Sequence, residues 1–67
     1  MAKISFKAAR VAANMTQEEL AEKLDVSRST VINWENGKTE MRMVYLYAFC
    51  HITGFSEDDI ILPEVST

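Results

Sequence analysis

The chain has 67 residues, which is enough for one domain burying roughly 60% of its unfolded surface, but not for a second catalytic or sensor domain. Its single cysteine excludes an internal disulfide, and its single histidine leaves too few ligands for a metal site. The sequence contains no apolar run near the ~20 residues that span a membrane, so we expect a soluble, cytoplasmic protein. We expect one domain over residues 1–67, ordered from about residue 4 to residue 63, that uses no cofactor.

The net charge of −3 at pH 7 is unevenly distributed along the chain. Residues 1–42 hold all seven Lys and Arg with six acidic residues, for a net charge of +1, whereas residues 43–67 hold four acidic residues and no Lys or Arg. This asymmetry predicts one end that faces nucleic acid and an opposite end that faces solvent or a partner. Because basic groups are few, we expect any affinity for DNA to fall readily with added salt.

The first expected helix covers about residues 6–14 and carries one unusual residue on its apolar stripe. Ser5 can cap its start. Phe6, Ala9, Arg10 and Ala13 share one side at the spacing i, i+3, i+4 and i+7. Arg10 therefore needs a partner inside the domain, unless its side chain only reaches out to water and phosphate.

Two short helices with their own start signals follow at residues 17–24 and 28–36. Thr16 and Glu19 have the spacing of a capping box, and Ser27 caps the second helix. Gly37 supplies the left-handed residue that ends such helices. Each cap is preceded by an apolar residue at the spacing of a hydrophobic staple. Because the turn between them is short, the two helices must cross steeply, as in a helix-turn-helix.

The second of these helices has two chemically different faces. Val31 and Trp34 fall on an apolar side, whereas the opposite side carries Arg28, Ser29, Ile32 and Asn33. Arg can bond guanine and Asn can bond adenine bidentately, Ser is an adaptable partner, and Ile can meet a thymine methyl. The alternative is a solvated polar face, but its place on the second helix of a helix-turn-helix favours base contacts in the major groove.

After Gly37, we expect a long helix over about residues 41–53, ended by Gly54, and a final helix EDDIIL that Ser56 caps and Pro63 stops. Consecutive helical residues point about 100° apart, so residues 60–62 cannot all enter one small core. This predicts either loose packing or an exposed dimer patch. The patch would consist of Met43, Phe55, Ile61 and Leu62.

The stretch TQEELAEKLDVSRSTVINWENGK resembles the helix-turn-helix of the Cro-type, lambda-repressor-like regulators, and GFSEDDIILP resembles the last helix of their short phage-type members. The match runs from about residue 6 to residue 63. One departure is Asp25, where the family usually has glycine; Asp tolerates left-handed backbone better than most residues. The positions that carry the resemblance are Gln17, Ala21, Leu24, Val31, Trp34 and the run from Glu35 to Lys38.

The resemblance implies an all-α, compact five-helix domain that binds operator DNA, usually as a two-fold dimer. It also implies that Arg10 pairs with Glu35, because family members with these residues pair them, and that Lys38 and Arg42 grip the DNA backbone. Gln17 opens its helix where the dipole favours phosphate. The full set of expected DNA backbone contacts is Gln17, Ser27, Thr30, Asn36, Lys38 and Arg42.

We therefore expect a transcriptional regulator, a repressor in the simplest case, whose homodimer reads a pseudo-palindromic double-stranded DNA operator without a small-molecule ligand. Two alternatives remain open at the level of sequence. One is the DNA-binding antitoxin of a toxin–antitoxin pair, and the other is a protein-interaction module that has lost DNA binding. An enzyme is not expected, because no nucleophile, base and orienting group form a plausible cluster.

Overall fold

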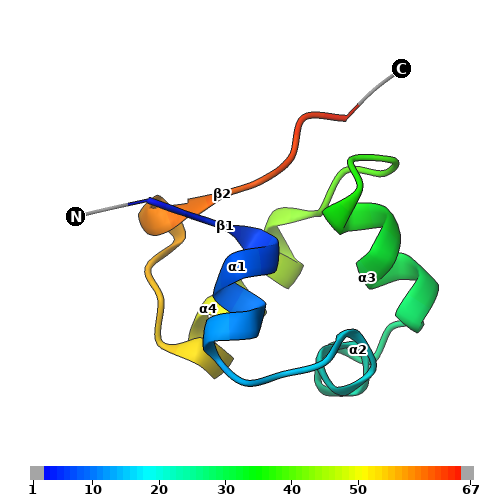
Figure 1. The fold of residues 1–67 in the computed structure, drawn as a ribbon, viewed down its shortest axis with the longest axis horizontal. Coiled ribbons are helices and arrows are strands. Elements are labelled where there is room, and N and C mark those ends of the chain that lie inside the picture. Colours follow the sequence, from blue (N-terminus) through cyan, green and yellow to red (C-terminus); the bar gives the residue numbers. More distant parts are fainter. Residues whose placement is uncertain (1–2, 66–67) are drawn as a thin grey trace.

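The computed structural model describes residues 3–65 and is mainly helical, with a short two-stranded sheet at one end (Figure 1). None of the helices within these residues is both long enough and apolar enough to cross a membrane. In chain order the elements are β1 (Ile4–Ser5), α1 (Phe6–Ala12), α2 (Gln17–Leu24), α3 (Arg28–Glu35), α4 (Met43–Thr53), the 3-10 turn η1 (Glu57–Asp59) and β2 (Ile60–Ile61).

Helix α1 begins where the sequence predicts and ends earlier. The Ser5 hydroxyl accepts a hydrogen bond from the Ala8 N–H at 3.1 Å, which satisfies one of the free donors of the first turn. The helix ends at Ala12, two residues before the expected end, because Asn14 has a φ of 61°. Asn adopts this left-handed conformation more readily than most residues. The chain then turns toward α2.

Helices α2 and α3 both carry the predicted caps. The Thr16 hydroxyl accepts from the Glu19 N–H at 3.0 Å, and the Glu19 carboxylate accepts from the Thr16 N–H at 2.9 Å. The backbone N–H of Thr16, and after it the Thr16 hydroxyl, stabilise the Glu19 carboxylate and hold the pKa of Glu19 below its usual value. Asp25 ends α2 in the left-handed region, with φ 56° and ψ 45°, and Ser27 caps α3 two residues later. The helix-turn-helix is therefore built by local chemistry at each end.

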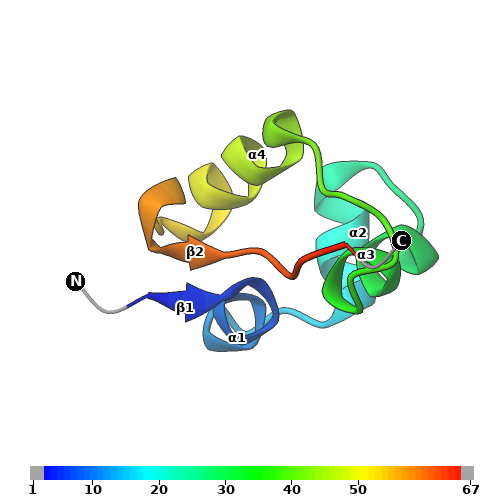
Figure 2. The same ribbon diagram turned by 90° about the horizontal axis from the view of Figure 1, so that it is seen from above.

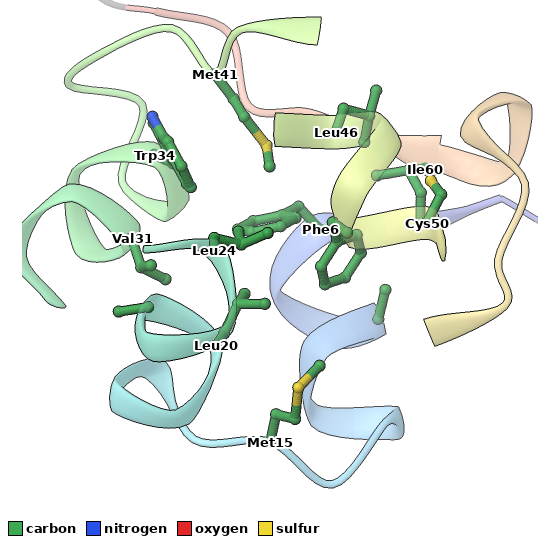
Figure 3. Packing of buried hydrophobic residues seen from close by; sticks show 13 residues of the cluster. Phe6, Met15, Leu20, Leu24, Val31, Trp34, Met41, Leu46, Cys50 and Ile60 are labelled. Atoms are coloured by element: carbon green, nitrogen blue, oxygen red, sulfur yellow. The ribbon is translucent and has the colours of Figure 1, made fainter. Parts of the chain in front are cut away.

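The core lies where the four α-helices meet, around Phe6 (Figure 3). Phe6 and Phe49 are both fully buried. The Phe6 ring lies 4.7 Å from the Phe49 ring centroid and edge-on to Trp34 at 6.4 Å. Leu20 and Val31 bring α2 and α3 to the same cluster. One continuous apolar cluster thus fixes the helix-turn-helix to α1 and α4.

The predicted fifth helix is not present, so the expected five-helix count is wrong for the described residues. Ser56 caps only the single 3-10 turn η1, and the chain then forms β2, which pairs in parallel with β1 through Ile4–Ile60 and Ser5–Ile61. A helix stopped by Pro63 would contain few i→i−4 hydrogen bonds, too few to offset the unfavourable free energy of helix nucleation. Pairing with β1 gives Ile60 and Ile61 backbone partners and buries Ile60, while Ile61 stays half exposed.

Helix α4 begins at Met43 rather than near Met41, with Arg42 as its cap residue, and ends as predicted at Gly54. Met41 lies in the preceding loop and is buried in the core. Val44 and Tyr47 on this helix carry large side chains but are 64% and 50% exposed. Helix α4 contains no Asp, Glu, Lys or Arg, so its sequence has no stripe of these residues that marks the exposed side.

The C-terminal segment, defined here as residues 62–65, follows β2 and runs back across the molecule toward the C-terminal end of α3 (Figure 2). It covers Gly37, which is buried although it lies in a loop. Gly37 has a φ of +70°, and a Cβ at this position would lie 2.6 Å from the Glu64 carbonyl oxygen. Only glycine fits this turn under the segment, for reasons of both conformation and space.

Gly37→Ala is therefore expected to destabilise the domain more than Gly54→Ala. Gly54 is also left-handed, with φ +84°, but nothing lies within 4 Å of a Cβ built there. The Gly54 variant should lose only the backbone term of about 1–2 kcal/mol, and the Gly37 variant should lose more, because the Glu64 backbone must move. Urea denaturation of both variants measures the difference. Equal losses would show that the segment does not pack on Gly37 in solution.

Candidate nucleic-acid interface

Helix α3 presents its polar side outward because its apolar side is anchored. Val31 is fully buried and Trp34 is 5% exposed. On the opposite side, Arg28 and Ser29 are exposed. The remaining two residues that the sequence analysis assigns to base contacts, Ile32 and Asn33, are half-buried.

The start of α3 is held by a compact hydroxyl pair. The Ser27 hydroxyl accepts from the Thr30 N–H at 3.1 Å, and the Ser27 and Thr30 hydroxyls lie 2.8 Å apart in a further hydrogen bond. Only one hydroxyl hydrogen is used between the two residues, so the other can still be donated. Both residues were predicted as DNA backbone contacts, and the pair leaves one donor for such a contact.

The end of α3 is a Schellman turn followed by exposed basic residues. The Lys38 N–H donates to the Asn33 carbonyl at 2.9 Å and the Gly37 N–H donates to the Trp34 carbonyl at 3.2 Å. Asn36 and Lys38 are exposed at this turn, and so is Arg42 at the start of α4. Within residues 3–65, none of these three side chains forms a hydrogen bond or an ion pair.

Arg10 and Glu35 form an ion pair behind α3. Arg10 Nε lies 2.7 Å from Glu35 Oε2, and the two side chains are only 8% and 2% exposed. Arg10 Nη2 lies 3.4 Å from Glu35 Oε1, and Arg10 Nη1 donates to the Met15 carbonyl at 2.7 Å. Among the described residues, no buried side-chain nitrogen or oxygen lacks a hydrogen-bond partner. The pair therefore ties α1 to the last residue of α3 with its polar atoms satisfied.

Gln17 joins this network, which the sequence analysis did not foresee. Its Nε2 donates to Glu35 Oε1 at 3.0 Å. The residue is half-buried, and its side chain is tied to α3 rather than extended into solvent. A count of donors and acceptors could have indicated a further partner, because the two carboxylate oxygens of a buried Glu can accept about four hydrogen bonds and Arg10 supplies only two of them. Glu35 thus contacts α1 and α2 from the end of α3.

The four residues of the predicted dimer patch differ in how far their side chains are exposed to solvent. Met43 and Ile61 are each 50% exposed, whereas Phe55 and Leu62 are half-buried and pack against the core. Val44 and Tyr47 on α4 are at least as exposed as Met43. The outer side of α4 therefore offers more accessible apolar surface than Phe55 and Leu62 do.

The remaining reactive groups do not suggest a second site. Cys50 is buried, and burial, followed by the nearby carboxylates of Glu57 and Asp59, raises the pKa of its thiol and so disfavours the reactive thiolate. No group of three or more His, Cys, Asp or Glu that could hold a metal lies within residues 3–65. In that part of the chain, the polar side of α3 and the flanking Lys38 and Arg42 are the main candidate interface.

A family model described as helix-turn-helix matches residues 6–60, which includes all four α-helices. The chain belongs to the Cro/lambda-repressor-like helix-turn-helix family. Proteins of this family are DNA-binding transcriptional regulators. This family member is also 37% identical, over 62 residues, to an uncharacterized HTH-type transcriptional regulator from Methanocaldococcus jannaschii. That alignment covers 92% of this chain and 94% of the relative. No solved structure was found to match the chain.

Proposed function

We propose that this chain is a sequence-specific transcriptional regulator, acting as a repressor, that reads a pseudo-palindromic operator with α3 in the major groove. The observation that carries the proposal is the orientation of α3. Val31 and Trp34 hold one side in the core, and Arg28 and Ser29 are exposed on the other. A helix held in this way can enter a groove about 12 Å wide with its polar side first.

The base-reading set is proposed to be Arg28, Ser29, Ile32 and Asn33. Arg28 and Ser29 lie in the first turn of α3, which is the part of a recognition helix that reaches base edges. Arg28 would donate bidentately to guanine O6 and N7, and Asn33 would bond adenine N6 and N7. The half-buried Ile32 would use its remaining apolar surface against a thymine methyl.

The phosphate-binding set would lie at both ends of α3. Exposed Asn36, Lys38 and Arg42 follow its C-terminus, and the Ser27–Thr30 hydroxyl pair stands at its N-terminus. Gln17 would add a contact from the start of α2. Phosphate contacts position the protein, whereas base contacts specify the sequence. These two groups should therefore respond differently to mutation.

A homodimer would place two copies of α3 in successive major grooves about 34 Å apart. The proposed dimer patch is Met43, Phe55, Ile61 and Leu62, of which Met43 and Ile61 offer the larger exposed fractions. Neither residue carries a charge, so an isologous contact between two copies would bring no like charges together at this point. Sedimentation of the chain with and without operator DNA would establish whether the dimer forms.

Arg28→Ala should weaken operator binding by about 1–3 kcal/mol and relax discrimination at one base pair. Lys38→Ala should weaken binding to operator and random DNA alike, and reduce the slope of log K against log salt by about 0.9, because one phosphate contact is lost. Sites selected from a random DNA pool by the wild-type chain provide the operator, and fluorescence anisotropy at several salt concentrations measures both variants.

Lys23→Ala is the matched control, because Lys23 is an exposed lysine on α2 that is not assigned to the interface. It should bind like the wild type. If Arg28→Ala and Lys38→Ala lose affinity uniformly for all sequences, the division between base and phosphate contacts is wrong. If the wild-type chain binds no selected site more tightly than random DNA, the proposed function itself is wrong.

A further inference from the structure

The hydrogen bond between Gln17 and Glu35 fixes which way the Gln17 amide is turned. Glu35 carries its carboxylate next to the guanidinium of Arg10, and an ionised carboxylate can only accept hydrogen bonds. The atom of Gln17 that faces it at 3.0 Å must therefore be the amide nitrogen. One Nε2 hydrogen is used in this bond. The second Nε2 hydrogen and the amide oxygen are not used by any residue from 3 to 65.

The Glu35 carboxylate is fixed by contacts with Arg10, so it offers Gln17 an acceptor in a fixed position. The Glu35 side chain is 2% exposed and is gripped through both oxygens by Arg10. Arg10 is in turn fixed to the Met15 carbonyl at 2.7 Å, directly before the cap of α2. A half-buried glutamine bonded to a buried, ion-paired carboxylate loses most of its rotamer freedom before any ligand arrives.

We propose that Glu35 is a positioning residue for DNA binding, which presents the second Nε2 hydrogen of Gln17 to a phosphate oxygen. This inference rests on the proposed function and adds a mechanism to it. A phosphate accepts hydrogen bonds and cannot donate them to Gln17, so only an N–H can make the contact. Glu35 keeps the amide oxygen turned away from the position where it would oppose a phosphate. The ion pair that supports the recognition helix thereby also pre-organises a backbone contact on the neighbouring helix.

The contact in the free protein can be tested by NMR, because Gln17 is the only glutamine in the sequence. In the 15N-labelled wild-type chain without DNA, we expect two well-separated Gln17 side-chain amide protons, with the bonded one exchanging slowly with solvent. In Glu35→Asp, which keeps the charge but withdraws the carboxylate, both should move toward the values of an unstructured peptide. Unstructured values in the wild-type chain would overturn the proposal.

The role in binding is tested by a double-mutant cycle on operator affinity. Gln17→Ala and Glu35→Asp should each weaken binding about tenfold, as expected for one hydrogen bond to a charged group, and the double variant should also lose about tenfold. The salt slope should stay unchanged in all three, because Gln17 is neutral and Glu35 is turned inward. A loss of about a hundredfold in the double variant would show that the two residues act independently.

Gln17→Asn provides a second variant in case Glu35→Asp does not fold. Its amide is one methylene shorter and cannot span Glu35 and a phosphate together, so it should lose about tenfold as Gln17→Ala does. Wild-type affinity in this variant would contradict the positioning role. If the wild-type chain shows the structured amide signals but does not prefer any selected DNA site, the proposed function fails and the inference about phosphate fails with it.

Discussion

Replacing Glu35 with alanine is expected to lower the free energy of unfolding by about 3–5 kcal/mol. The variant leaves the guanidinium of Arg10 in a site where its side chain is 8% exposed, without the carboxylate that lies 2.7 Å from Nε. A domain of this size has a total stability of roughly 3–10 kcal/mol, at about 0.05–0.15 kcal/mol per residue. The loss would therefore remove a large share of the total stability. Urea denaturation followed by circular dichroism measures it.

The matched control removes both charges together. Arg10→Met combined with Glu35→Leu replaces the pair with apolar side chains of similar length, which is often neutral or stabilising for buried ion pairs. We expect this double variant to be at least as stable as the wild type, apart from the lost bonds to Met15 and Gln17. A double variant as unstable as Glu35→Ala would mean that the pair itself, rather than the unpaired charge, accounts for the loss.

Phe6→Ala is the second large loss that we expect, at about 3–5 kcal/mol. Phe6 is fully buried and its ring contacts Phe49 on α4 and Trp34 on α3. The cavity would open at the junction of three helices, where no single segment can move to fill it without disturbing the others. Chemical denaturation with tryptophan fluorescence is a suitable measurement, because Trp34 lies beside the cavity.

Val11→Ala is the control for Phe6→Ala on the same helix. Val11 is 56% exposed, so its truncation should change the free energy of unfolding by no more than about 0.5 kcal/mol. Operator affinity, corrected for the folded fraction, should stay close to the wild-type value in both variants, because neither residue belongs to the proposed interface. Similar losses of stability in the two variants would indicate that α1 does not pack as in Figure 3.

The caps and ends of the helix-turn-helix could be predicted from the sequence because they depend on neighbouring residues. The Thr16–Glu19 capping box, the Ser27 cap and the left-handed Asp25 and Gly37 are all present in the structure. Each satisfies backbone groups within a few residues, so its chemistry can be identified from a short stretch of sequence.

The end of the chain could not be predicted in the same way. Ser56 is a correct cap signal, but the sequence favoured a helix where η1 and β2 are found. The deciding contact is the pairing of Ile60 with Ile4, at the opposite end of the chain. Local propensity contains no information about this partner, and tertiary pairing overrode it.

The exposed side of α4 and the environment of Gln17 were also decided by tertiary packing. Because α4 contains no Asp, Glu, Lys or Arg, its sequence did not predict that Val44 and Tyr47 would be exposed. Gln17 was predicted from its position at the start of α2 to contact DNA. Its bond to Glu35 forms only because the C-terminal end of α3 packs close to the start of α2.

The sequence by itself determined the two capped helices of the motif, the polar and apolar sides of α3, and the need of Arg10 for a partner, because these depend on residues within one or two helical turns. Tertiary structure alone decided the β1–β2 pair, the segment packed on Gly37 and the hydrogen bond from Gln17 to Glu35. Those features join parts of the chain that only meet after folding. Their partners come from distant parts of the sequence, which no local pattern can specify.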